Sequence, residues 1–276
     1  MELERFEEKI LALLRAKQYL PLQKYLETLN PADVAECLDD LLDEKEIDWE
    51  EDLPRIFRLL PKELASDVFA EMEPELQSKL IDAFSDKELG EVLGDMFLDD
   101  TVDVIEEMPA NVVKRILKNV DGDTRKQINQ ILNYPEDSAG SLMTTEYVDL
   151  RPAMTVREAF DHIRHTGVDK ETIYICYIIG PTRKLLGLVS VRELLLATPD
   201  TVLRDMMETN IISVTTLDDR EDVANLFTRY DFTALPVVDR ENRLVGIVTV
   251  DDAIDVLQEE ATEDIEKMAA ITPSEH

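Results

Sequence analysis

The first half of the chain repeats a hydrophobic position every twelve residues. Between residues 60 and 120 a large apolar side chain recurs at that interval: Leu60, Met72, Phe84, Met96, Met108 and Val120. Residues that favour helix starts follow each one: Pro61, Glu73-Pro74, Ser85-Asp86, Asp99-Asp100, Pro109 and Asp121. The pattern predicts a solenoid of short helices that bury their apolar faces only against neighbouring repeats. The alternative is an irregular helical bundle in which the spacing is accidental.

The residues before this repeat are also predicted to be helical. An amphipathic pattern covers residues 1–27 and predicts one helix or two, with a break near Pro21. Asn30 is a good N-cap and Pro31 a good first helical residue, so a further helix is expected to start there.

The second half contains a tandem repeat of a different kind. The segment 187–195 recurs at 246–254, and 143–148 recurs at 207–212. The two offsets differ by five residues, so the first copy carries an insertion, which we place in 165–170. In each copy a short apolar strand leads into a polar cap and a helix, and further strands are expected at 174–179 and 235–238. Each copy therefore predicts a β-α-β-β-α unit.

Composition narrows the possible partners. The 276 residues include 61 Asp and Glu against 29 Lys and Arg, a net charge of −32, while 44% of residues are hydrophobic. The length suits two domains, and the apolar content suits folded cores. Such a charge argues against nucleic acid and against docking on anionic lipid, because both need a basic surface. It favours cations, which would relieve the repulsion among carboxylates.

Several other classes of protein are disfavoured. Cys37 and Cys176 lie among apolar neighbours, which predicts buried free thiols in a reducing compartment. The first residues are acidic, unlike a signal peptide, and the longest apolar run, 173–179, is too short to span a membrane. The chain as given is therefore expected to be soluble. Its three histidines show no zinc-ligand spacing, its eight glycines form no phosphate loop, and we expect no enzyme.

Two acidic segments are candidates for cation binding. Nine acids and one base lie between residues 86 and 107, and Asp99 and Asp103 are four apart, on one face of a helix. Helix-start preferences explain these positions equally well. Eight acids and no base lie between residues 251 and 266, where a solvated helix face is the alternative. Spacing alone does not choose between these explanations.

The repeated Gly-hydrophobic-hydrophobic-Ser/Thr-x-x-Asp/Glu motif of the second half resembles a tandem pair of CBS domains, over about residues 138–258. The stretch Leu235-Pro236-Val237-Val238-Asp239 belongs to the same resemblance. CBS pairs often bind adenine nucleotides, with the hydroxyl facing phosphate and the acid facing ribose. The resemblance implies nucleotide-binding roles for the following residues: Ser190, Glu193, Phe232, Thr249 and Asp252. Glu193 departs from the usual Asp, which favours the Thr249 pair, and the alternative is that Thr249 only caps a helix.

The whole chain resembles the cytosolic region of the MgtE family of magnesium channels and transporters. The resemblance is carried by the segment from Tyr134-Pro135-Glu136-Asp137 to Met143-Thr144 and by Asn30-Pro31-Ala32-Asp33, Tyr230-Asp231-Phe232-Thr233 and Glu260-Ala261-Thr262-Glu263-Asp264-Ile265. It implies a multidomain fold, an all-α superhelical N-terminal domain followed by an α/β tandem CBS pair. The expected boundaries are 1–133 for the helical domain, 134–200 and 201–260 for the CBS domains, and 261–276 for the start of a connecting helix.

In that family the region is a homodimeric magnesium sensor on the cytoplasmic side of the plasma membrane, followed by a transmembrane pore. Magnesium between the helical domain and the CBS pair holds a closed state, and low magnesium releases it. The ligands implied by aligned motifs are Asp67, Asp99, Asp103, Asp231, Asp252, Asp255, Glu221, Glu260 and Glu263, with Asp264 and the Ser141 carbonyl as further candidates. Asp67 stands where the family can have Glu, a longer arm.

Mg²⁺ prefers oxygen ligands and keeps several waters, so carboxylates from two domains suit it chemically. Two other functions remain open from the sequence. One is an adenine-nucleotide-sensing CBS protein in which magnesium is incidental. The other is a helical interaction scaffold with a CBS dimerisation module.

Overall fold

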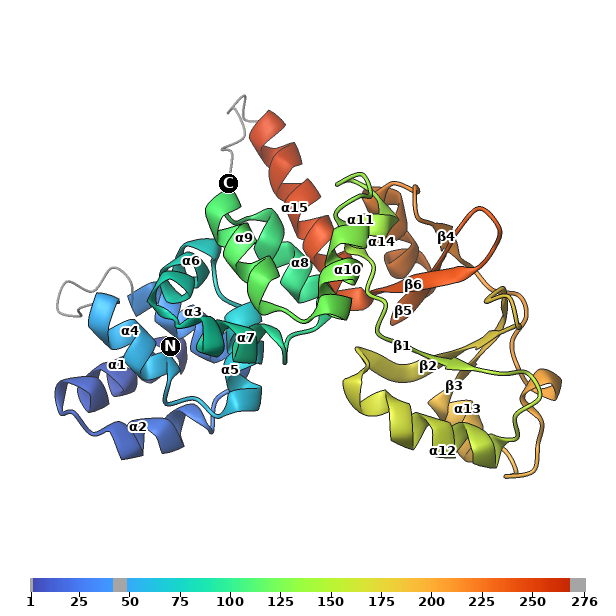
Figure 1. The fold of residues 1–276 in the computed structure, drawn as a ribbon, viewed down its shortest axis with the longest axis horizontal. Helices are drawn as coiled ribbons and strands as arrows, with labels where there is room; N and C mark the ends of the chain where they lie inside the picture. Colours follow the sequence, from blue (N-terminus) through green and yellow to red (C-terminus); the bar gives the residue numbers. More distant parts are fainter. Residues whose placement is uncertain (1, 42–48, 269–276) are drawn as a thin grey trace. The chain divides into compact units, whose positions relative to one another are not determined.

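The chain folds into two compact units in a computed structural model that describes residues 2–41 and 49–268 (Figure 1). One unit comprises Met1–Met96 with Asp100–Gln127, and the other comprises Phe97–Asp99 with Ile128–His276. The expected division at residue 133 falls just beyond helix α10 (Gly122–Ile131), which crosses from the first unit into the second.

The first unit is all helical. Its helices are α1 (Glu2–Arg15), α2 (Tyr19–Leu26), α3 (Pro31–Asp40), α4 (Trp49–Phe57), α5 (Lys62–Ala70), α6 (Pro74–Ala83), α7 (Asp86–Leu93), α8 (Leu98–Glu106), α9 (Ala110–Asn119) and α10. From α5 to α10 there is one helix per twelve residues, which confirms the predicted solenoid. Alternate helices pack together: α1 on α3, α3 on α5, α5 on α7 and α7 on α9.

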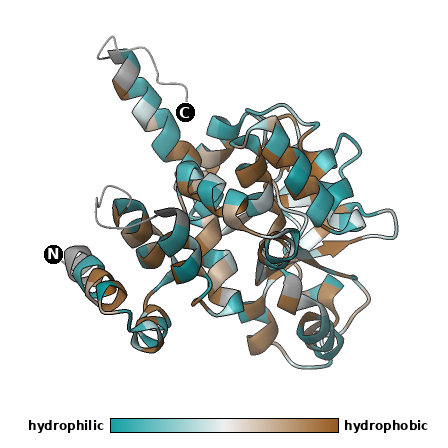
Figure 2. Cartoon of the chain, turned by 60° about the vertical axis from the view of Figure 1, so that its left-hand side comes forward, coloured by the Kyte–Doolittle hydropathy of each residue, from teal (hydrophilic) through white to brown (hydrophobic). Residues whose placement is uncertain are grey.

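The repeat positions form the core of this unit. Five of the six are buried, and Met96 is partly buried. Phe57, Phe69 and Phe84 pack ring to ring, with centroids 5.3–6.3 Å apart. Hydrophobic residues follow one side of the helices and hydrophilic residues the other (Figure 2). A single short helix therefore cannot bury its apolar face by itself and needs the neighbouring helices to cover it.

Three predicted helix boundaries need comment. α3 does begin at Pro31 with Asn30 as N-cap, although the Asn30 amide donates to Asp33 Oδ2 at 3.3 Å instead of accepting from the backbone. The predicted break near Pro21 is found at residues 16–18, between α1 and α2, and Pro21 itself sits in the first turn of α2, where no backbone N–H is needed. The predicted cap at residues 99–100 is wrong, since α8 already begins at Leu98.

The second unit contains two copies of β-α-β-β-α, as predicted. The first copy has β1 (Tyr147–Leu150), α12 (Val156–Thr166), β2 (Thr172–Ile179), β3 (Leu185–Ser190) and α13 (Val191–Leu196). The second has β4 (Val214–Thr215), α14 (Arg220–Tyr230), β5 (Ala234–Val238), β6 (Leu244–Thr249) and α15 (Val250–Met268). In each three-stranded sheet the first pair is parallel and the second antiparallel. Short helical turns complete the unit: α11 (Ala139–Leu142), η2 (Gly167–Asp169), inside the predicted insertion, and η3 (Leu203–Asp205).

Each copy reaches across to the sheet of the other copy. Thr144, which precedes β1, pairs with Ile247 of β6, and Glu208, which precedes β4, pairs with Leu188 of β3. A Cβ on Gly246 would lie 2.7 Å from Met143 Sδ, so only glycine fits beneath the crossing segment. The two copies therefore share one folded unit and do not form separable domains.

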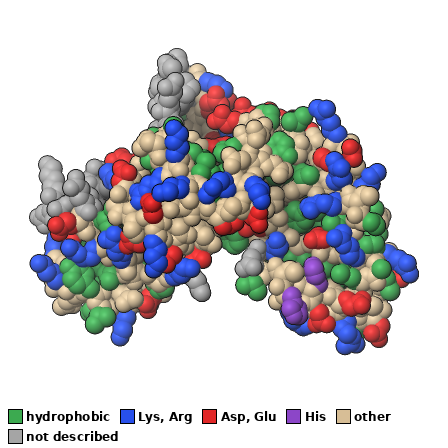
Figure 3. All heavy atoms as spheres, viewed as in Figure 1, with side chains coloured by type: hydrophobic (Ala, Val, Ile, Leu, Met, Phe, Trp, Pro, Cys, Tyr) green, Lys and Arg blue, Asp and Glu red, His purple; other side chains and the backbone are tan. Residues whose placement is uncertain are grey.

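Three further predictions concern groups outside any site. Cys37 and Cys176 are both buried free thiols, and burial raises the pKa of each to about 12. The two histidines of α12 lie at the surface (Figure 3), where His165 Nδ1 contacts the Asp161 carbonyl. Among the described helices, none has the length and apolar content needed to cross a bilayer.

Candidate functional site: acidic clusters on the helical unit and the CBS-like unit

The clearest group of predicted ligands lies where the start of α14 faces the second half of α15. Glu221 is in the first turn of α14, while Glu260 and Glu263 are on α15. The pKa of Glu260 is raised, first by burial and then by the negative charge of Glu221, with a further contribution from Glu263. The structure therefore brings these three carboxylates close enough to repel one another, and acidic side chains gather along the exposed end of α15 (Figure 3).

The start of α15 holds a second group of acids. The Thr249 hydroxyl donates to Asp252 Oδ2 at 2.6 Å, and the Thr249 N–H donates to the same oxygen at 3.2 Å. Burial nevertheless raises the pKa of Asp252 to about 6, and the charges of Asp251 and Asp255 contribute in the same direction. Burial and the charges of Asp251 and Glu259 likewise raise the pKa of Asp255. This end of the helix is short of positive charge.

Asp231 lies beside an apolar pocket in the same unit. It ends α14 with φ at 54°, in the left-handed region, and its side chain is exposed. The pocket has a volume of about 270 Å³ and is lined by Phe227, Thr228, Asp231, Phe232, Val250, Ala253, Ile254 and Leu257. Phe232 stacks on Tyr230 with ring centroids 5.3 Å apart. An apolar wall beside a carboxylate can receive a flat ring or a partner side chain.

The two predicted nucleotide motifs have the same local geometry but different burial. Ser190 caps α13, accepting from Glu193 N at 3.2 Å and donating to its carboxylate at 2.7 Å. Thr249 and Asp252 repeat this hydroxyl-to-carboxylate bond. Glu193 is exposed and Ser190 half-buried, whereas Thr249 is only 4% exposed. Helix capping, the alternative explanation of these motifs, therefore accounts for the Ser190 pair, whose hydroxyl accepts from the helix backbone, and this pair is also the more accessible of the two.

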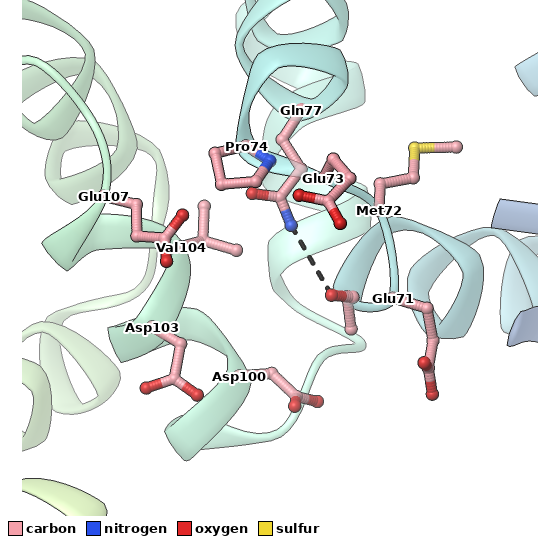
Figure 4. Close-up of a pocket in the computed structure, with 10 residues that line it drawn as sticks. Glu71, Met72, Glu73, Pro74, Gln77, Asp100, Asp103, Val104 and Glu107 are labelled. Carbon is pink, nitrogen blue, oxygen red and sulfur yellow. Dashed lines mark hydrogen bonds between the residues drawn. The ribbon is translucent and has the colours of Figure 1, made fainter. Parts of the chain in front are cut away.

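The predicted ligands in the first half of the chain come from two helices. Asp67 is an exposed residue of α5, and α8 carries Asp99, 7% exposed, and Asp103, exposed. Asp103 also lines a pocket of about 180 Å³ between the α5–α6 turn and α8, with Asp100 and three glutamates: Glu71, Glu73 and Glu107 (Figure 4). Asp67 is not among the residues that line it.

The remaining predicted residues lie elsewhere in the CBS-like unit. Ser141, in α11, is 9% exposed, and its hydroxyl donates to the Ser138 carbonyl at 2.8 Å. Asp264 is an exposed residue of α15. Within residues 2–41 and 49–268, no three acidic, histidine or cysteine side chains converge as ligands on one point.

Sequence reasoning overlooked two features of these clusters. The glutamates Glu71 and Glu73 were not predicted, and Glu107 was noted only as part of the acidic segment 86–107, although all three line the same pocket as Asp103. The twelve-residue repeat was the available signal, because it places turns and helix ends of neighbouring repeats side by side. Arg220 was also missed. The sequence around this single base gives no repeat or motif that indicates its partners. Only the packing of the helices shows which carboxylates it contacts.

Comparison with known proteins gives consistent matches along the chain. Residues 29–137 match the model of the MgtE intracellular N domain, and residues 139–200 and 203–259 each match the CBS domain model. The magnesium transporter MgtE of Thermus thermophilus is 40% identical over 254 residues, covering 91% of this chain and 55% of the relative. That of Bacillus subtilis is 34% identical over 262 residues, covering 95% of this chain and 56% of the relative. The chain thus spans about half the length of these curated relatives.

A solved structure matches nearly end to end. A crystal structure of the cytosolic domain of the Mg²⁺ channel MgtE in complex with ATP has a TM-score of 0.81 and 37% sequence identity. The match covers 90% of this chain and 99% of the solved one. These relatives are transport proteins by name and not enzymes.

Proposed function

Because the chain belongs to the MgtE family, we propose that it is the cytosolic magnesium-sensing region of a magnesium channel or transporter. In this proposal Mg²⁺ is held jointly by acids of the helical unit and of the CBS pair. Bound Mg²⁺ favours a compact state that closes a transmembrane pore of the same protein, and low Mg²⁺ releases it. The ion shifts the equilibrium only by its higher affinity for the compact state.

The observation that carries this proposal is the crowding of carboxylates along α15, which the bases Arg220 and Lys267 neutralise only in part. Asp252, Asp255 and Glu260 all have pKa values raised by burial and by neighbouring carboxylates. A raised pKa in a carboxylate means that its ionised form is penalised where it sits. A divalent cation removes that penalty, because it neutralises several carboxylates while keeping part of its own water shell.

Small-angle scattering of the chain, titrated with MgCl₂ against NaCl of matched ionic strength, tests the proposal. A fall in the radius of gyration with magnesium alone is expected, and Asp252→Asn with Asp255→Asn should weaken it. Asp161→Asn with Asp200→Asn is the matched control, since both are exposed acids of the same unit. Equal responses to both salts would mean screening only and would reject the sensor.

The CBS-like unit is proposed to form a homodimer. Large apolar side chains stand exposed on its helices: Leu195 and Leu196 on α13, Tyr230 on α14, and Val250 and Ile254 on α15. Leu196 is 78% exposed and Ile254 is 47% exposed, which is costly in water and typical of a covered surface. Sedimentation equilibrium should give a dimer that Ile254→Glu weakens. A monomeric wild-type chain would contradict this part of the proposal.

Adenine-nucleotide binding is a second candidate function. It is supported by the accessible Ser190–Glu193 pair and by the stacked Tyr230 and Phe232 rings, and the related solved structure is a complex with ATP. Calorimetry with ATP, in EDTA and again with Mg²⁺, measures it. If Glu193→Gln abolishes ATP binding and Thr249→Val retains it, the nucleotide site is at the Ser190–Glu193 pair. The reverse result would assign the second pair, and no heat in either buffer would reject the function.

A further inference from the structure

Arg220 lies at the centre of the acidic group formed by α14 and α15. Its guanidinium is 3.1 Å from Glu259, 3.9 Å from Glu260 and 3.5 Å from Asp137. The side chain is 25% exposed. It therefore meets carboxylates from two parts of the chain in a partly desolvated position, where an ion pair is stronger than on the open surface.

The second proposed ligand on α15 has its own basic partner. Lys267 Nζ lies 2.5 Å from Glu263, one turn further along the helix. Both glutamates on α15 that are proposed to bind the cation are thus already paired with a base, Glu260 with Arg220 and Glu263 with Lys267. The chain itself therefore neutralises part of the charge of this cluster.

Arg220 also joins α15 to the segment that leads into the first CBS copy. Besides the ion pair with Asp137, the Arg220 N–H donates to the Asp137 carbonyl at 3.2 Å. Ser138 pairs with Asp219, and the Ala139 N–H donates to the Asp218 carbonyl at 2.8 Å. The backbone of this segment is therefore anchored to the start of α14, and Arg220 extends that anchor to α15.

We propose that Arg220 is an internal counter-ion that competes with a divalent cation for Glu260 and thereby sets the cation affinity of the Glu221–Glu260–Glu263 group. A cation bound there displaces the guanidinium from Glu260 and leaves it with Glu259 and Asp137. Arg220 is a positioning residue in this scheme, because it does not ligate the ion. The inference rests on the proposed function, since it requires a cation at these glutamates.

Magnesium calorimetry on the full chain tests this with four proteins: wild type, Arg220→Gln, Arg157→Gln, and the double variant Glu260→Gln with Glu263→Gln. The double variant identifies the binding component that belongs to the group. Arg157, which pairs with Asp200 at 3.6 Å, is the matched control for losing one positive charge. Removing a unit charge about 5 Å from a divalent ion at high dielectric should tighten that component about threefold to tenfold in Arg220→Gln. Arg157→Gln should change it less than about twofold.

The possible results distinguish competition by Arg220 from cation binding at the glutamates. If the component exists but Arg220→Gln binds no tighter than Arg157→Gln, the competition is wrong and the sensor proposal stands. If the double variant binds magnesium like wild type, no cation occupies these glutamates, and both the competition and the assignment of Glu260 and Glu263 are wrong. Arg220→Lys keeps the charge but loses the planar guanidinium, so it should give an intermediate magnesium affinity. This variant replaces Arg220→Gln in the test if Arg220→Gln does not fold.

Discussion

The hydroxyl of Thr249 donates to the Asp252 carboxylate across 2.6 Å, in a pair whose threonine is buried and whose aspartate is half-buried. The same motif at Ser190 and Glu193 makes the same bond in the open. Burial outweighs the hydrogen bond at Asp252, so the pKa of its carboxyl is raised to about 6 although Thr249 acts in the opposite direction. The same sequence motif thus forms an accessible pair at Ser190 and, at Thr249, a less accessible pair whose carboxyl has a raised pKa.

Thr249→Val should raise the pKa of Asp252 further, because it removes the hydroxyl that stabilises the ionised form. The variant should also lose about 1 kcal/mol of stability, as is usual for a buried hydrogen bond. Carboxyl NMR titration and urea unfolding measure the two effects. Ser190→Ala is the control: it should leave the titration of Asp252 unchanged, and a shift there would show that the two pairs are linked.

Asp39 should make the helical unit less stable as the pH rises. Burial raises the pKa of Asp39 to about 6. Its Oδ2 accepts from Glu73 N at 3.3 Å, whereas its Oδ1 has no hydrogen-bond partner among the residues that the structure describes. A carboxyl with a higher pKa in the folded state stabilises the fold below its unfolded pKa, near 4, and that stability is lost as the pH rises through about 6.

Asp39→Asn keeps an acceptor for Glu73 N and removes the titration. After allowance for partial solvent exposure, it should gain about 1 kcal/mol at pH 7 and nothing at pH 4. Chemical unfolding of both proteins between pH 4 and pH 7.5 measures this. A gain of equal size at both ends would contradict the assignment, since it would not depend on ionisation.

Arg115 on α9 should be a principal support of the solenoid. Its guanidinium donates to the carbonyls of Ile81 and Phe84, at the end of α6, and to Asp86 Oδ1 at 3.2 Å. Arg115→Ala leaves those carbonyls without a donor and should cost about 2 kcal/mol. Lys118→Ala, which removes only an exposed ion pair with Asp86, should cost less than about 1 kcal/mol. Equal losses in urea unfolding would show that the carbonyl contacts contribute nothing.

Gly246→Ala should disrupt the crossing of the two CBS-like copies. The new Cβ would lie 2.7 Å from Met143 Sδ and 2.8 Å from the Thr144 carbonyl oxygen, and the second of these atoms is backbone that cannot rotate away. A loss of about 2 kcal/mol is expected from such overpacking. Gly122→Ala is the control, because a Cβ there meets nothing within 4 Å and should be neutral or slightly stabilising. Met143→Ala should rescue Gly246→Ala only in part.

Local pattern was enough to predict the two halves of the fold. A period of twelve residues predicts one short helix per repeat, and the recurrence of 187–195 at 246–254 predicts two equivalent sheets. Both predictions succeed because the spacing of apolar residues within a segment is enough to indicate which element buries them. The wrong helix start at residues 99–100 also has a local cause. α8 begins at Leu98, and an acid in the first turn of a helix cannot be told from an acid at the N-cap by sequence alone.

The sequence by itself determined the elements, their order, and which residues carry negative charge. Only the tertiary structure decided that Glu221 faces Glu260, that Arg220 reaches both Glu259 and Asp137, and that Thr249 is buried while Ser190 is not. The physical reason is range. Helix and strand preferences act between residues a few positions apart, whereas burial and the convergence of side chains depend on which distant surfaces pack together.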